Sequence, residues 1–190
     1  MRTTLTLIAN QFFPILAMVA VGSAAALLVS RRLRESFTAD VLLMLAAVVA
    51  SVMMGGSLFY SEVAMFLPCV LCWVQRGFAY PLVPALWAAK QLPKLHVKRV
   101  VSLMGAVMAT LGLCVSIYHY LLQRIPALST GTFCDPNNPC SAAYVMTWGF
   151  VSIPFMAGCG FVALTVLLFF AARGFKAELA EEVAEEADAG

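Results

Sequence analysis

Two pairs of closely spaced cysteines are the residues of this sequence best suited to chemistry. Cys69 and Cys72 form a C-x-x-C in the segment PCVLCW, and Cys134 and Cys140 bracket five residues, DPNNP. A thiolate attacks a disulfide through a mixed-disulfide intermediate, so two neighbouring pairs can exchange electrons. A dithiol at the start of a helix meets unpaired N–H groups and a positive dipole end, which stabilise the reactive thiolate. These four cysteines are therefore candidate catalytic residues.

Arg76 and His119 are candidate partners of this chemistry. Arg76 follows Cys72 by four residues and so shares its helical face. A guanidinium there would favour the Cys72 thiolate and polarise a carbonyl oxygen on a bound acceptor; the alternative is an arginine that extends to the membrane interface. His119 lies between two tyrosines, where an interfacial histidine within an aromatic belt is the alternative. Cys114 and Cys159 are interpreted as small buried fillers.

The composition is that of a membrane protein. Of 190 residues, 62% are hydrophobic and 12% charged, about half the charged fraction of a soluble domain. The net charge of +2 gives no argument for nucleic acid as a partner. Five stretches reach the roughly 20 apolar residues that cross a bilayer. They cover 11–30, 41–60, 70–89, 100–122 and 151–172.

The short connections between these spans predict the orientation. Lys and Arg concentrate after the first, third and fifth spans, at Arg31, Arg32, Arg34, Lys90, Lys94, Lys98, Arg99, Arg173 and Lys176. The positive-inside rule places these connections in the cytoplasm and the N-terminus outside. We expect a single multi-pass domain over 1–176, outside loops at 61–69 and 123–150, and an acidic cytoplasmic tail at 177–190. The first span has small residues of the kind found at signal cleavage sites, but its length favours a retained helix.

The two cysteine pairs must lie on the same face of the membrane. Exactly two predicted spans separate their loops, so this holds even if the orientation is inverted. The charge rule places that face outside, where oxidising conditions allow disulfides to persist. Cys134 and Cys140 could alternatively form a simple staple, since Asp-Pro and Asn-Pro favour turns. A loop this short would gain less than the about 3 kcal/mol of a 15-residue loop.

The sequence resembles the DsbB/BdbC family of bacterial disulfide bond formation proteins. The resemblance is carried by PCVLCWVQR from Pro68 to Arg76 and its flanks SLFYSE and YPL, and it covers roughly 41–172. The close spacing of Cys134 and Cys140 is similar to the BdbC branch. The family fold implies an all-α membrane protein, with a four-helix transmembrane bundle, to which this chain adds one N-terminal transmembrane helix.

The resemblance also implies a function. A reduced thioredoxin-like thiol oxidase (DsbA/BdbD-like) would attack the Cys134–Cys140 disulfide, which would then exchange with Cys69 and Cys72. Cys72, beside Arg76, would donate to a quinone, ubiquinone or menaquinone, drawn from the membrane, and His119 resembles the family histidine near that quinone. A quinone is needed because thiol oxidases of the DsbA kind, near −120 mV, are too oxidising for a glutathione pool to recharge.

Three alternatives remain at this point. A vitamin K epoxide reductase-like enzyme also combines a membrane C-x-x-C with loop cysteines, although in that family the loop pair precedes the motif. The four cysteines could form a Cys₄ zinc site in a metal-handling module, which an oxidising location disfavours. A membrane scaffold with structural cysteines would tolerate Cys72→Ser. We expect no metal.

Overall fold

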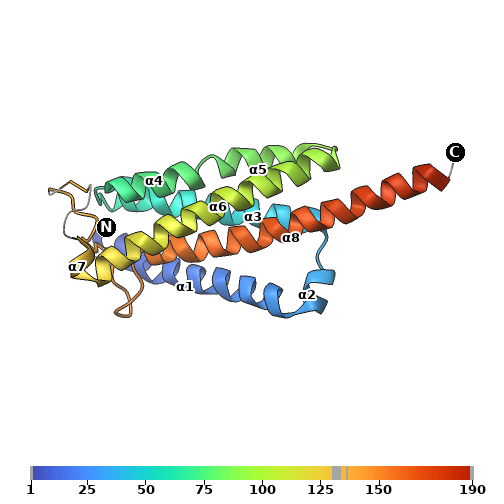
Figure 1. Cartoon of the computed structure of the whole chain (residues 1–190). Coiled ribbons are helices and arrows are strands. Elements are labelled where there is room, and N and C mark those ends of the chain that lie inside the picture. The colour runs from blue at the N-terminus through green and yellow to red at the C-terminus, as the bar shows by residue number, and fades with distance from the viewer. Residues whose placement is uncertain (1, 130–133, 136, 189–190) are drawn as a thin grey trace.

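The protein is a bundle of helices that lie side by side, with their axes nearly parallel or antiparallel (Figure 1). The computed structural model describes residues 2–129, 134, 135 and 137–188. Its helices are α1 (Arg2–Val29), α2 (Arg31–Glu35), α3 (Ala39–Leu58), the π-helical turn η1 (Phe59–Val63), α4 (Val70–Ala79), α5 (Leu82–Gln91), α6 (Leu95–Arg124), α7 (Pro126–Ser129) and α8 (Ile153–Asp188). The described residues contain one isolated β-bridge, between Thr147 and Val151, and no strand.

Four of the described helices are long and apolar enough to cross a membrane. They cover Thr4–Val29, Ala39–Val63, Leu95–Arg124 and Ile153–Asp188. An all-α membrane bundle is therefore confirmed, and the added N-terminal span is a helix, α1, that packs along α8.

The third predicted span, 70–89, is not one helix but two, α4 and α5, of ten residues each. The break falls at Tyr80 and Pro81. Proline has no N–H to donate, and its ring collides with the carbonyl four residues before it, here that of Gly77. The C-x-x-C therefore begins a short helix of its own, placed at one end of the bundle.

Several helices are longer than the apolar stretches that predicted them. α1 begins at Arg2 rather than near residue 11, and α8 continues without a break through the predicted acidic tail to Asp188. The Ala and Glu residues of that tail are strong helix formers, so a helix persists where the apolar pattern ends. In the predicted loop 123–150, residues 130–133 and 136 lie outside the described residues, as do 189 and 190 of the tail.

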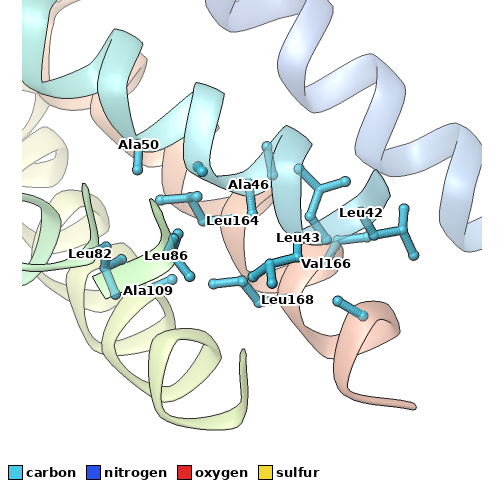
Figure 2. Packing of buried hydrophobic residues seen from close by; sticks show 14 of the residues in the cluster. Leu42, Leu43, Ala46, Ala50, Leu82, Leu86, Ala109, Leu164, Val166 and Leu168 are labelled. Atoms are coloured by element: carbon cyan, nitrogen blue, oxygen red, sulfur yellow. The ribbon is translucent and has the colours of Figure 1, made fainter. Parts of the chain in front are cut away.

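The core is built from small residues that let helices approach closely. Alanines 46, 47 and 50 of α3 are fully buried against leucines of α8 and α5 (Figure 2). A Cβ at Gly112 of α6 would lie 2.5 Å from the ring of Phe161, and one at Gly160 would lie 2.5 Å from the sulfur of Met53. Such close approach is how helices gain van der Waals contact inside a membrane.

The two ends of the bundle differ in charge. At one end lie α2 and the turn between α5 and α6, where Lys98 donates to Asp40 at 2.8 Å. At the other end lie the N-terminus, the start of α4 and α7 (Figure 1). The chain thus separates its basic connections from its C-x-x-C by the full length of the bundle.

Candidate redox site

Cys69 and Cys72, which we call the inner pair, lie at the start of α4. Cys69 is the N-cap residue, with extended backbone, and Cys72 lies in the first turn. Their sulfur atoms are 3.2 Å apart, a hydrogen-bonding distance for two thiols, and both are free. Cys69 is buried, whereas Cys72 is partly exposed. The pair is therefore a dithiol positioned for exchange.

Cys134 and Cys140, which we call the outer pair, are joined in a disulfide. The chain reverses between them through Asp135, whose carboxylate accepts from the backbone N–H of Asn137 at 2.8 Å and whose carbonyl accepts from Asn138 at 3.0 Å. This is the turn chemistry of an Asx residue. Cys140 is 2% exposed and Cys134 is partly exposed, so Cys134 is the more accessible sulfur of the disulfide.

His119 of α6 connects the two pairs. Its Nε2 lies 3.5 Å from Cys69 Sγ and 3.1 Å from the carbonyl oxygen of Cys140, and its Nδ1 lies 3.5 Å from Nε2 of Gln75. A carbonyl can only accept, so Nε2 carries the proton and Nδ1 accepts from the Gln75 amide. The same N–H therefore serves the loop backbone and the Cys69 sulfur.

Further contacts hold the two loops together. The Asn138 side chain donates to the carbonyl of Pro68 at 3.2 Å, directly before Cys69. The four redox cysteines also share one apolar cluster with Leu71 and Leu122. The structure thus brings together at one end of the bundle the two pairs that the sequence placed in separate loops.

The electrostatics of the dithiol favour charge on Cys69. The hydrogen bond from the Cys72 thiol and, next, the one from His119 lower the pKa of Cys69 well below its ordinary value, although burial opposes them. His119 and the N-cap position both act on Cys69. The Cys72 thiolate beside Arg76 stays a prediction.

Arg76 is held by Ser57 of α3. Its Nε donates to Ser57 Oγ at 2.9 Å and its Nη2 to the Ser57 carbonyl at 3.0 Å. The guanidinium also lies over the rings of Trp73, at 4.9 Å, and Tyr80, at 5.8 Å. These contacts fix a cation one helical turn from Cys72.

An apolar cavity of about 660 Å³ begins beside Cys72 and Arg76. Residues of α1, α3 and α8 form its walls, and it continues as far as Leu27 and Leu33. Its lining includes Cys72, Gln75 and Arg76 but neither Cys69 nor His119. His119 thus lies between the cysteine pairs, apart from the cavity.

Sequence reasoning missed two residues that shape this site. Gln75 orients His119, and Ser57 anchors Arg76. The signal for Gln75 was its place three residues after Cys72, on the same helical face, and for Ser57 its place in the SLFYSE flank.

A second chemistry is compatible with part of this site. Cys69, Cys72 and His119 have ligand atoms that all lie within 4.8 Å of one another, an arrangement able to hold a soft metal ion. Cys134 and Cys140 are joined to each other, so they cannot act as thiolate ligands in this state. The Cys₄ zinc site considered from the sequence is therefore reduced here to three ligands.

Comparison with known proteins identifies the family. Residues 39–171 match the family model described as "Disulfide bond formation protein DsbB". The "Probable disulfide formation protein" of Oceanobacillus iheyensis is 44% identical over 132 residues, 68% of this chain and 87% of that protein. The "Disulfide bond formation protein C" of Bacillus subtilis is 40% identical over 131 residues, 69% of this chain and 91% of that protein. No solved structure gives a significant match. The chain is a multi-pass membrane bundle with two cysteine pairs at one end, and the family model matches its residues 39–171. It therefore belongs to the DsbB family of disulfide bond formation proteins.

Proposed function

We propose that this protein oxidises the dithiol of an extracytoplasmic thioredoxin-like thiol oxidase and passes the two electrons to a membrane quinone. Protein-disulfide oxidation is the activity of its family at the coarsest level. The finer proposal rests on one observation. His119 contacts both cysteine pairs, while Cys72 and Arg76 line an apolar cavity.

The partner step begins at the exposed sulfur of the loop disulfide. A thiolate of the partner attacks Cys134, which is partly exposed, and Cys140 leaves as a thiolate. The second partner thiol then attacks the mixed disulfide. The partner leaves oxidised and Cys134 is released reduced, so two electrons have entered the loop pair.

The internal step transfers the electrons from the loop pair to the inner pair, through Cys140 and Cys69, which are buried in the same cluster. In the oxidised inner pair, the Cys140 thiolate attacks Cys69 and releases Cys72 as a thiolate beside Arg76. Attack of Cys134 on Cys140 then restores the loop disulfide and releases Cys69, whose thiolate receives the hydrogen bond of His119. The product, a loop disulfide and an inner dithiol, matches the state described above.

The cavity fits an apolar two-electron acceptor. Its volume of about 660 Å³ lies within the usual range for ligand pockets, and the cation of Arg76 stands near one end of a largely aliphatic lining. A bound quinone would accept two electrons and two protons. Arg76 would hold a carbonyl oxygen next to Cys72, and the walls formed by α1 and α3 would hold an isoprenoid tail. Ubiquinone and menaquinone both satisfy this chemistry.

The charge distribution supports an extracytoplasmic redox end. The basic connections and the redox cysteines lie at opposite ends of the bundle. Short connections rich in Lys and Arg stay in the cytoplasm. The cysteines and the N-terminus would then face outside and the C-terminus the cytoplasm.

The test is a quinone-reduction assay with the full-length protein in lipid nanodiscs and a reduced thioredoxin-like partner. We expect quinol to form in step with partner thiol loss, and turnover to stop when Cys69, Cys72, Cys134 or Cys140 is replaced by serine. Cys114→Ser is the matched control and keeps its turnover, since Cys114, predicted from the sequence to be a buried filler, is instead exposed on α6 and lies outside the cluster. Full activity of Cys72→Ser would support a scaffold instead. Bound zinc without quinone-dependent thiol loss would support a metal-handling module.

A further inference from the structure

The hydroxyl of Tyr60 is buried in the cavity wall without a hydrogen-bond partner. Tyr60 is 5% exposed, and its Oη has no donor or acceptor within reach among the described residues. The same residue lines the cavity that Cys72 and Arg76 line. Buried polar groups are almost always hydrogen-bonded, and one that is not calls for a reason such as a ligand absent from the structure.

The ring of Tyr60 is fixed by its neighbours. Its centroid lies 5.6 Å from that of Phe13 on α1, 5.8 Å from that of Phe59, and 5.9 Å from that of Phe66, with which it stacks. Tyr60 also belongs to the π-helical turn η1. Such turns are rare and occur frequently at functional sites. The ring is therefore held in place at the cavity wall, and its hydroxyl is buried away from water.

We propose that Tyr60 donates a hydrogen bond to a carbonyl oxygen of the quinone, as a binding residue in addition to Arg76. This inference rests on the proposed function. A quinone offers two carbonyl oxygens, which only accept, and the residues that line the cavity include Arg76 and two tyrosines with unpaired hydroxyls, Tyr60 and Tyr80. His119 is not available for this role, because its Nε2–H already serves Cys140 and Cys69.

The hydrogen bond would matter most as the quinone is reduced. Two electrons from Cys69 and Cys72, with the two protons that the partner dithiol gave up, convert the quinone to the quinol, while the two sulfurs join in a disulfide. Negative charge builds on the carbonyl oxygens before the protons arrive, and a fixed donor stabilises that charge. Tyr60 keeps its own proton throughout, so the stoichiometry is unchanged.

Tyr60→Phe tests the proposal, since it removes only the hydroxyl. We expect the KM for quinone to rise about three- to tenfold, the effect of one lost hydrogen bond. Single-turnover transfer from the reduced partner to the loop disulfide, without quinone, stays unchanged. The Tm without quinone stays equal or rises, because the variant no longer buries an unpaired hydroxyl. A merely structural role predicts a lower Tm instead.

Two further variants make the outcomes distinct. Tyr118→Phe removes an exposed hydroxyl on α6 outside the cavity and keeps the wild-type KM. Tyr80→Phe removes the other unpartnered tyrosine hydroxyl of the same wall. An unchanged KM in Tyr60→Phe, or a rise confined to Tyr80→Phe, overturns the assignment of Tyr60. Failure of the wild-type protein to reduce any quinone overturns the proposed function itself.

Discussion

His119 Nε2 lies 3.5 Å from the sulfur of Cys69, although 50 residues separate them in the sequence. The same nitrogen lies 3.1 Å from the backbone carbonyl of Cys140. One imidazole on α6 therefore holds the loop that carries the outer disulfide and stabilises charge on the inner dithiol. The proposed electron exchange between the pairs would depend on both contacts, because the attacking and leaving sulfurs must meet in a buried cluster.

His119→Ala should raise the pKa of Cys69. The pKa of this thiol is lowered first by Cys72 and then by His119, so loss of the imidazole removes part of the shift and leaves the opposing effect of burial. A lowered pKa means that the thiolate forms at lower pH; in the variant it forms only as the pH rises further. The measurement is the ultraviolet absorbance of thiolate between about pH 4 and about pH 9, after reduction of the inner pair.

The same titration on Cys69→Ser identifies which sulfur is responsible. The low-pH transition of the wild-type protein should be missing from the curve of this variant. A low-pH transition that survives in Cys69→Ser would place the charge on another cysteine and contradict this assignment.

Cys72→Ser should trap the internal exchange as a disulfide between Cys69 and Cys140. In the variant, Cys69 can attack Cys140 of the loop disulfide, and Cys134 leaves as a thiolate. Without Cys72 the inner disulfide cannot form, and alkylation of the released Cys134 blocks the reverse attack that would free Cys69. Cys140 is the expected partner because it is buried with Cys69, whereas Cys134 is only partly buried beside the same cluster. Peptide mapping by mass spectrometry without reduction reports the bond. A Cys69–Cys134 bond would reverse the proposed order of attack.

The sequence was sufficient to place both cysteine pairs at one end of the bundle, because that placement follows from the order of the spans. Counting two spans between the loops already places Cys69 and Cys134 on one face of the membrane, whatever the side chains do. The break at Pro81 was also readable in principle, since proline interrupts helices.

The contacts of His119 with the two cysteine pairs could not be predicted in the same way. Which cysteine the imidazole meets depends on the rotation of α6 about its axis and on the path of the loop, which are set by packing such as that of Gly112 against Phe161. The prediction of a thiolate on Cys72 rested on the start of its own helix and on the spacing to Arg76. Spacing within one helix cannot reveal a histidine that arrives from another.

Arg76→Ala should weaken quinone use with little effect on the partner step. Arg76 stands on the cavity wall and is bound to Ser57, away from the loop disulfide. We expect the KM for quinone to rise at least tenfold, as charge-assisted hydrogen bonds are about twice as strong as neutral ones. Arg76→Lys should recover only part of the loss, because an ammonium cannot reproduce the planar fork that meets both oxygens of Ser57. Equal KM values for wild type and Arg76→Ala, measured by steady-state quinone reduction, would remove Arg76 from the acceptor site.

Ala20→Phe should distinguish binding of the quinone head group from binding of its isoprenoid tail. Ala20 belongs to α1, which lies outside the region matched by the family model, and it lines the cavity beyond the Cys72 end. A phenyl ring there would fill the path of an isoprenoid chain but leave the space beside Arg76 open. We therefore expect the KM for a long-tailed quinone to rise about tenfold or more, and that for a short-tailed analogue to stay near the wild-type value. Ile15→Phe, on a face of α1 that is exposed and does not line the cavity, is the matched control. If Ala20→Phe affected both quinones equally, the tail would not run along α1 and the variant would be acting on the head or on the fold.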